Sequence, residues 1–239
     1  MNTLNLTKKE IRDYFSTPVA YIVLVVFGVI IGVYFSQFVF VDNQASLRKI
    51  FEFIPMLWII FIPAITMKSF SEELKTGTLE VLATLPVSKK QIIISKVLSN
   101  LFVAFVMLLS TLPLAYTIIK LGNPDIGQII ISYLGLLLVA SAYIFVGIVV
   151  SINSRNQIVA FILSSFVIAL LYFIGEVQVL NFVPNKYRDF FEFLGMGSHY
   201  KSIAKGVVDS RDIIYYLSLL VLLYQLILIS FNRIQKKGK

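Results

Sequence analysis

The side chains that could carry chemistry are few in this sequence, and they lie outside its long apolar runs. There is one histidine, His199, no cysteine, and 13 aspartates and glutamates in 239 residues. The lack of cysteine excludes disulfides, thiolate zinc sites and cysteine nucleophiles. The chain also has no G-x-x-x-x-G-K-[ST] loop that could bind ATP phosphates. We therefore predict no catalytic residue, no bound cofactor and no metal site, and we interpret His199 as an interfacial hydrogen-bonding residue.

Charged residues gather in one connector, from Lys68 to Lys96. Two S-x-x-[EQ] patterns in it, Ser69 with Glu72 and Ser88 with Gln91, are typical of helix N-termini. Apolar or small side chains recur between these patterns at helical spacing, at Phe70, Leu74, Thr78, Val81 and Leu85. Gly77 interrupts this spacing and Pro86 ends it. The connector is predicted to form a surface helix from Glu72 to Leu85, a break at Pro86 and a second helix from Ser88, with the first helix either docked on a partner or simply solvated.

The elements that position this connector are apolar. Hydrophobic residues make up 58% of the chain and charged residues only 14%, and about 20 apolar residues suffice for a helix to cross a bilayer. We predict an all-α integral membrane protein, one transmembrane domain over residues 1–239, with six transmembrane helices. The predicted spans are residues 19–41, 50–67, 97–119, 128–152, 156–175 and 213–231.

Ionisable residues are missing from the interior of these runs, since Glu52 and Glu176 lie only at their ends. Ion-coupled carriers keep such groups in the membrane interior. Their absence disfavours an ion-coupled carrier, an intramembrane protease and a metal-dependent lipid transferase.

The basic residues indicate an orientation. With both termini in the cytoplasm, the inner segments hold 13 of the 21 lysines and arginines, which agrees with the positive-inside rule. The net charge of +8 is then explained by an anionic membrane surface rather than by nucleic acid.

Three further segments have recognisable patterns. The N-terminal segment places Leu4, Ile11, Tyr14 and Phe15 near one helical face, and Thr7 with Glu10 fits a capping box, so an amphipathic interfacial helix is predicted.

Gly28 and Gly32 form a G-x-x-x-G pattern in the first span, which allows close helix packing either within the chain or against another subunit.

The loop before the last span is predicted to contain two short amphipathic helices. Their apolar positions are Tyr187, Phe190, Phe191 and Leu194, and then Tyr200, Ile203, Ala204 and Val207. Asp209 and Asp212 are predicted to cap the last span.

The connector also carries a family resemblance. Residues Phe61 to Lys96 read FIPAITMKSFSEELKTGTLEVLATLPVSKKQIIISK. This stretch resembles the E-E-x-x-x-G-T-x-E-x-L and L-P-V-S pattern of ABC-2-type permeases, most closely those of the gliding-motility and nitrous-oxide-reductase-maturation type. Residues Lys205 to Tyr216 and Lys9 to Tyr21 are similar to segments of the same permeases.

The resemblance implies a multi-pass permease subunit of an ATP-driven exporter in the bacterial cytoplasmic membrane. It implies a second permease subunit and cytoplasmic ATPases as partners, with ATP and Mg bound by the ATPases, and outer short helices that dip toward the membrane. The implied ATPase-coupling residues are Glu72, Glu73, Leu74, Gly77, Thr78, Leu79, Glu80, Leu82 and Pro86. The alternatives are a membrane assembly protein that transports nothing and a membrane-embedded enzyme.

Overall fold

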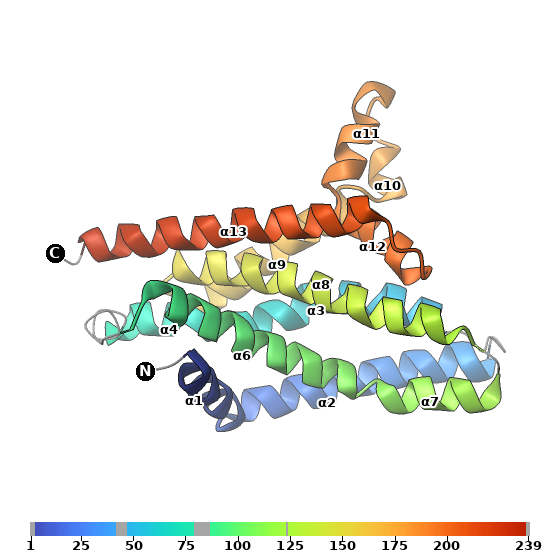
Figure 1. Cartoon of the computed structure of the whole chain (residues 1–239), viewed down its shortest axis with the longest axis horizontal. Coiled ribbons are helices and arrows are strands. Elements are labelled where there is room, and N and C mark those ends of the chain that lie inside the picture. The colour runs from blue at the N-terminus through green and yellow to red at the C-terminus, as the bar shows by residue number, and fades with distance from the viewer. Residues whose placement is uncertain (1–2, 42–46, 79–86, 123, 238–239) are drawn as a thin grey trace.

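The apolar runs of the sequence form long helices that lie side by side (Figure 1). The computed structural model describes residues 3–41, 47–78, 87–122 and 124–237, apart from the side chains of residues 40–41 and 235–237. Every regular element in these ranges is helical. The elements are α1 (Thr3–Phe15), α2 (Pro18–Ser36), the π-helical turn η1 (Gln37–Val41), α3 (Arg48–Thr66), α4 (Lys68–Thr76), α6 (Lys89–Leu109), α7 (Leu112–Leu121), α8 (Ile126–Ile152), α9 (Gln157–Phe173), α10 (Val177–Leu180), α11 (Asn185–Leu194), α12 (Met196–Ala204) and α13 (Ser210–Lys237).

Five helical stretches are long and apolar enough to cross a membrane. They are Pro18–Val39, Arg48–Thr76, Lys89–Leu121, Ile126–Ile152 and Ser210–Ile234. The predicted fifth span corresponds to α9, whose 17 residues make it a shorter apolar helix. The prediction of an all-helical membrane protein is confirmed, and the count of six spans stays a prediction.

Helix α8 lies at the centre of the bundle, in contact with α3, α6, α9 and α13. In its most apolar stretch, 67% of the residues are buried inside the chain, compared with 28% for α2 and 22% for α13. The outer faces of α2 and α13 expose large aliphatic side chains such as Val25, Val29 and Leu222. Such faces suit contact with lipid or with another membrane subunit.

The predicted third span is not one continuous helix. It divides into α6 and α7 at Ser110 and Thr111. Pro113, in the first turn of α7, has no backbone N–H to continue the helical hydrogen bonds. The hydroxyls of Ser110 and Thr111 donate to the carbonyls of Met107 and Leu108, which satisfies backbone acceptors at the break.

The N-terminal helix was predicted correctly, but its start was not, and of its predicted apolar face Tyr14 and Phe15 pack against the core while Leu4 does not. Helix α1 begins at Thr3, so Thr7 lies inside it and donates to the Thr3 carbonyl at 3.0 Å instead of forming a capping box with Glu10. Leu6 is the buried aliphatic side chain, whereas Leu4 is 68% exposed. Helix α1 lies across the bundle and packs on α6 (Figure 1).

The segment before the last helix forms α10, α11 and α12. Helices α10 and α11 project from the side of the bundle, while α12 packs against α8 and α9 (Figure 1). Both predicted amphipathic helices are present, although α12 ends at Ala204 and leaves Val207 outside. Asp209 caps α13 by accepting from the Arg211 N–H at 2.9 Å, whereas the Asp212 carboxylate contacts His199 Nδ1 at 2.7 Å.

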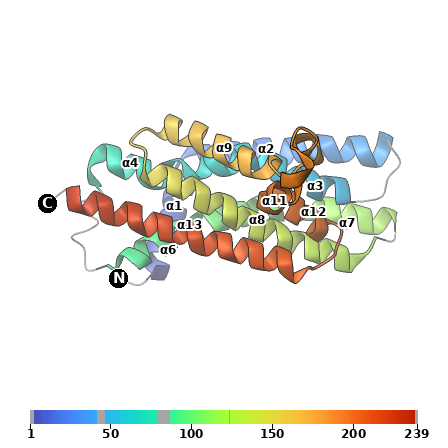
Figure 2. The same cartoon turned by 90° about the horizontal axis from the view of Figure 1, so that it is seen from above.

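The two ends of the bundle differ. Figures 1 and 2 place the N-terminal helix α1, helix α4 and the C-terminal end of α13 at one end, with α7 and the α10–α12 segment toward the other. The described coupling residues of α4 therefore lie at the same end of the bundle as α1 and the C-terminal end of α13.

Candidate functional site at the junction of α1, α4 and α6

Helix α4 continues the direction of the membrane helix α3 and is attached to the central helix α8 at their junction. The Ser151 hydroxyl of α8 accepts from the N–H groups of Phe70 and Ser71, at 3.0 and 3.1 Å, and donates to the Met67 carbonyl at 3.0 Å. These are backbone groups that a helix start or a helix end leaves without partners. One buried serine thus joins α3, α4 and α8.

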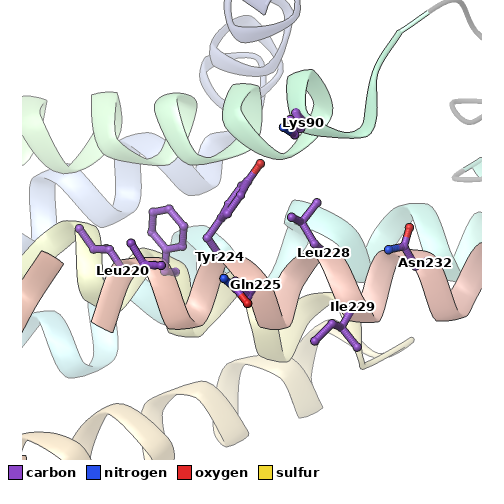
Figure 3. Close-up of a pocket in the computed structure, with 9 residues that line it drawn as sticks. Lys90, Leu220, Tyr224, Gln225, Leu228, Ile229 and Asn232 are labelled. Atoms are coloured by element: carbon purple, nitrogen blue, oxygen red, sulfur yellow. The ribbon is translucent and has the colours of Figure 1, made fainter. Parts of the chain in front are cut away.

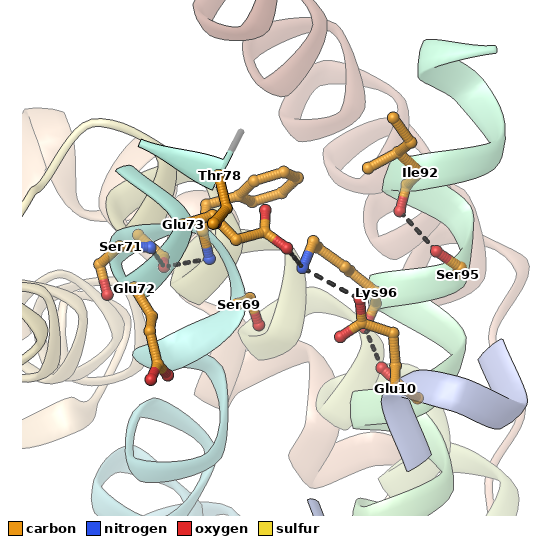
Figure 4. Close-up of polar contacts among 12 residues, drawn as sticks. Glu10, Ser69, Ser71, Glu72, Glu73, Thr78, Ile92, Ser95 and Lys96 are labelled. Carbon is orange, nitrogen blue, oxygen red and sulfur yellow. Dashed lines mark hydrogen bonds and ion pairs between the residues drawn. The ribbon is translucent and has the colours of Figure 1, made fainter. Parts of the chain in front are cut away.

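A buried ion cluster ties α4 to α1 and α6 (Figure 4). The Lys96 ammonium of α6 lies 2.7 Å from Glu73 Oε1 of α4 and 3.2 Å from Glu10 Oε1 of α1. The Lys96 side chain is 3% exposed, and those of Glu73 and Glu10 are 17% and 25% exposed. Its nitrogen also lies 5.0 Å from the centroid of the Phe70 ring. Because charges this far from water need partners, the three helices are held together as one unit.

A second polar network runs beside the ion cluster. The Tyr14 hydroxyl lies 2.5 Å from the Ile65 carbonyl and 2.8 Å from Asn100 Oδ1. The Asn100 amide donates to Ser69 Oγ at 3.0 Å and to the Lys96 carbonyl at 2.7 Å. Burial raises the pKa of the Tyr14 phenol, so its hydroxyl stays a donor at neutral pH. This network connects α1 to the end of α3, to α4 and to α6.

The predicted coupling residues divide between two faces of α4. Glu73 faces inward to Lys96, and Leu74 packs partly buried against the core, while Glu72 is exposed. The pairing of Glu73 within the chain corrects the expectation that it faces a partner. Thr78 is exposed, and its hydroxyl lies 2.9 Å from that of Thr76.

The predicted continuous helix from Glu72 to Leu85 is wrong, because α4 ends at Thr76. Gly77 follows in the left-handed conformation, with φ of +74°, where other residues are strained. The capping box of Ser69 and Glu72 is also wrong, since α4 already begins at Lys68. The box of Ser88 and Gln91 is confirmed at the start of α6. The predicted coupling residues Leu79, Glu80, Leu82 and Pro86 lie outside the described residues.

A cleft of about 350 Å³ separates α1 from α4 at this end of the bundle. Its charged lining includes Lys9, Asp13, Lys68 and Glu72. The described residues contain no group of three or more His, Cys, Asp or Glu side chains that could hold a metal ion. The arrangement binds helices to one another and presents charged side chains toward solvent.

The glycine pair of α2 is not used for packing inside the chain. A Cβ atom built on Gly28 or Gly32 would meet nothing within 4 Å. The pair therefore leaves a shallow open strip on α2, a helix that is mostly unburied within this chain.

Sequence reasoning missed Lys96, which it treated as one more basic residue of the inner connector. A signal was available in the spacing, because Lys96, Ser99 and Asn100 lie three and four residues apart and so share one face of α6. All three are buried. A polar face on an apolar helix indicates a buried polar partner.

The fold and this junction define a class of protein, a helical membrane protein in which α1, α4 and α6 are joined by buried polar contacts at one end. A family model described as ABC-2 family transporter protein matches residues 4–236. The chain therefore belongs to the ABC-2 family of transporter proteins, whose members are permease components of ABC transporters. A search among curated proteins gave no match.

Proposed function

We propose that this chain is the membrane-spanning permease subunit of an ATP-driven exporter. A separate cytoplasmic ATPase binds and hydrolyses ATP, because this chain lacks the phosphate-binding loop. The ATPase docks on α4 and the turn at Gly77, and its movement on ATP hydrolysis is passed to the membrane helices.

The proposal rests on the difference between the two faces of α4, because one face is bound to other helices and the other is exposed. Its inner face is bound to α1 and α6 through Lys96 and to α8 through Ser151. Its outer face exposes Glu72, Lys75 and Thr76 before the left-handed turn. Because α4 is bound to α1, α6 and α8, a force on its outer face is passed to those helices. Coupling between distant sites is carried by packed side chains and hydrogen-bond networks of this kind.

We also propose that a second permease subunit covers α2. The open strip at Gly28 and Gly32 lets another helix approach closely, as small residues do in membrane interfaces. The partner is either a second copy of this chain or a related subunit.

The orientation is tested by labelling cysteines introduced one at a time, which the cysteine-free sequence allows. With both termini in the cytoplasm, an impermeant thiol reagent added to intact cells should label Asp189→Cys and leave Lys75→Cys unlabelled. Both positions are exposed, so accessibility of the side chain is not in question. Labelling of Lys75→Cys without labelling of Asp189→Cys would show that the chain has the opposite orientation in the membrane.

The docking surface is tested by two substitutions at one position. Gly77→Ala and Gly77→Trp both place a side chain on left-handed backbone, at a cost of about 1–2 kcal/mol, and a Cβ atom there meets nothing within 4 Å. Only tryptophan adds bulk to the outer surface. We expect Gly77→Trp to reduce co-purification of the ATPase about tenfold or more, as disruption at an interface centre does, and to abolish transport, while Gly77→Ala retains most of both.

Membrane insertion of both variants, measured by detergent extraction and size-exclusion chromatography, is the control. Equal ATPase binding by Gly77→Trp and Gly77→Ala would remove this surface from the proposal. Transport by the purified chain alone, driven by an ion gradient, would contradict the proposed function as a whole.

A further inference from the structure

A groove runs along the outer face of the bundle between α13, α8 and the start of α6 (Figure 3). Its volume is about 540 Å³, within the range of sites that hold small molecules. One end is polar and the rest is apolar. Lys90 and Asn232 line the polar end, Gln225 lines the middle, and Phe145, Leu220 and Val221 line the apolar part.

The polar end carries positive charge at the level where α6 begins. Lys90, the second residue of α6, is exposed, and its ammonium has no ion-pair or hydrogen-bond partner in the part of the chain that the structure describes. The neighbouring Lys89 ammonium donates to Asn232 Oδ1 at 2.7 Å, which holds a second positive charge at this end. Two ammonium groups at the end of a membrane helix favour an anionic headgroup.

The polar side chains are spaced along α13. Asn232 lies at the charged end, and Gln225 lies seven residues away, about 10 Å along a helix axis. Gln225 is exposed on the outer side of a membrane-spanning stretch, where an amide without a hydrogen-bond partner is unfavourable. Farther along, Val221 and Leu220 with Phe145 of α8 form an apolar wall. From its charged end inward, the groove therefore presents first ammonium groups, then the Gln225 amide, and then apolar side chains.

We propose that this groove binds one anionic glycerophospholipid. The lysines hold its phosphate-bearing headgroup, the Gln225 amide donates to an ester carbonyl, and an acyl chain lies against Val221, Leu220 and Phe145. The occupant is a membrane lipid because the groove opens on the outer faces of membrane helices and its charge complements an anionic headgroup. The lipid joins α6, α8 and α13 at the end of the bundle that also carries the junction with α4.

The test places a fluorescent probe deep in the groove of the full-length chain. Val221→Cys is labelled with bimane and the protein is placed in bilayers of phosphatidylcholine and phosphatidylglycerol in which only one of the two lipids carries bromines on its acyl chains. Bromines quench bimane on contact. After correction for mole fraction, brominated phosphatidylglycerol should quench about fivefold better, the enrichment that one lysine near an anionic lipid provides.

Two variants separate the parts of the site. Lys90→Gln should reduce quenching by phosphatidylglycerol toward the phosphatidylcholine level. Gln225→Leu should reduce quenching by both lipids, because both carry the ester. Lys75→Gln, an exposed lysine of α4 outside the groove, is the matched control and should leave the preference unchanged.

A second probe gives the reference for ordinary lipid contact. Phe166→Cys on α9 is exposed, lies outside the groove, and should be quenched equally by both brominated lipids. Equal quenching at Val221→Cys would overturn the proposal, as would a preference that Lys90→Gln does not change. Quenching at Phe166→Cys with none at Val221→Cys would show that a protein segment fills the groove instead.

Discussion

Replacing Lys96 with methionine should destabilise the folded chain by about 3 kcal/mol, the lower end of the effect of removing one partner of a buried ion pair. Methionine keeps most of the volume but leaves the Glu73 and Glu10 carboxylates facing each other without a cation. The Glu73 carboxylate is already poorly satisfied, because its Oε2 atom is buried and has no hydrogen-bond partner among the described residues. Thermal unfolding in detergent, followed by size-exclusion chromatography, measures the loss.

The cause is separated from a general packing defect by a double variant. Glu73→Gln removes one of the uncompensated charges, so Lys96→Met with Glu73→Gln should be more stable than Lys96→Met alone. Lys75→Met on α4 is the exposed control and should unfold like the unmodified protein. A double variant as unstable as the single one would show that the ion cluster is not what holds this junction.

Replacing Gly147 of α8 with alanine should destabilise the bundle by about 1–3 kcal/mol, the usual effect of overpacking a core. A Cβ atom at Gly147 would lie 2.1 Å from Thr66 Oγ1 and 2.8 Å from Thr66 Cβ on α3. Thr66 is fully buried and β-branched, and its hydroxyl donates to the Ile62 carbonyl at 2.9 Å. The clash must therefore move α3 away from α8, close to the point where α3 meets α4.

Gly28 of α2 is the matched control, since alanine there meets nothing within 4 Å. Alanine is the better helix former, so Gly28→Ala should leave the isolated subunit as stable or slightly more stable. Combining Gly147→Ala with Thr66→Ala should restore part of the lost stability. Unfolding of Gly147→Ala at the same temperature as Gly28→Ala would contradict close contact between α3 and α8 at Thr66.

Lys96 and Gly147 both lie close to the junction of the membrane helices with α4. Contact between α3 and α8 at Gly147, the hydrogen bonds of Ser151 and the ion cluster at Lys96 all lie where the membrane helices meet α4. A docked ATPase acting on the outer face of α4 would therefore act through short contacts on α8, the most buried of the five candidate spans.

Local signals in the sequence predicted local structure well. Long apolar runs determined the helical membrane class, because only a helix satisfies every backbone hydrogen bond within a single segment in lipid. The capping box at Ser88 and Gln91 was found because its hydrogen bonds involve only near neighbours. The same reasoning failed at Ser69 and Thr7, where the helices begin earlier than the capping patterns suggested and place each side chain inside.

Residues of the same type lie in different environments, and only the tertiary structure shows which of them are buried and which are exposed. Gly28 and Gly147 both lie in apolar runs, yet one is open and the other lies against Thr66. Lys90 and Lys96 lie six residues apart on α6, and only Lys96 is buried with carboxylates from two other helices. The sequence by itself determined that these residues lie on membrane helices or at their ends. Their partners come from distant segments, and only the packing of those segments sets which charges leave water and which glycines are enclosed.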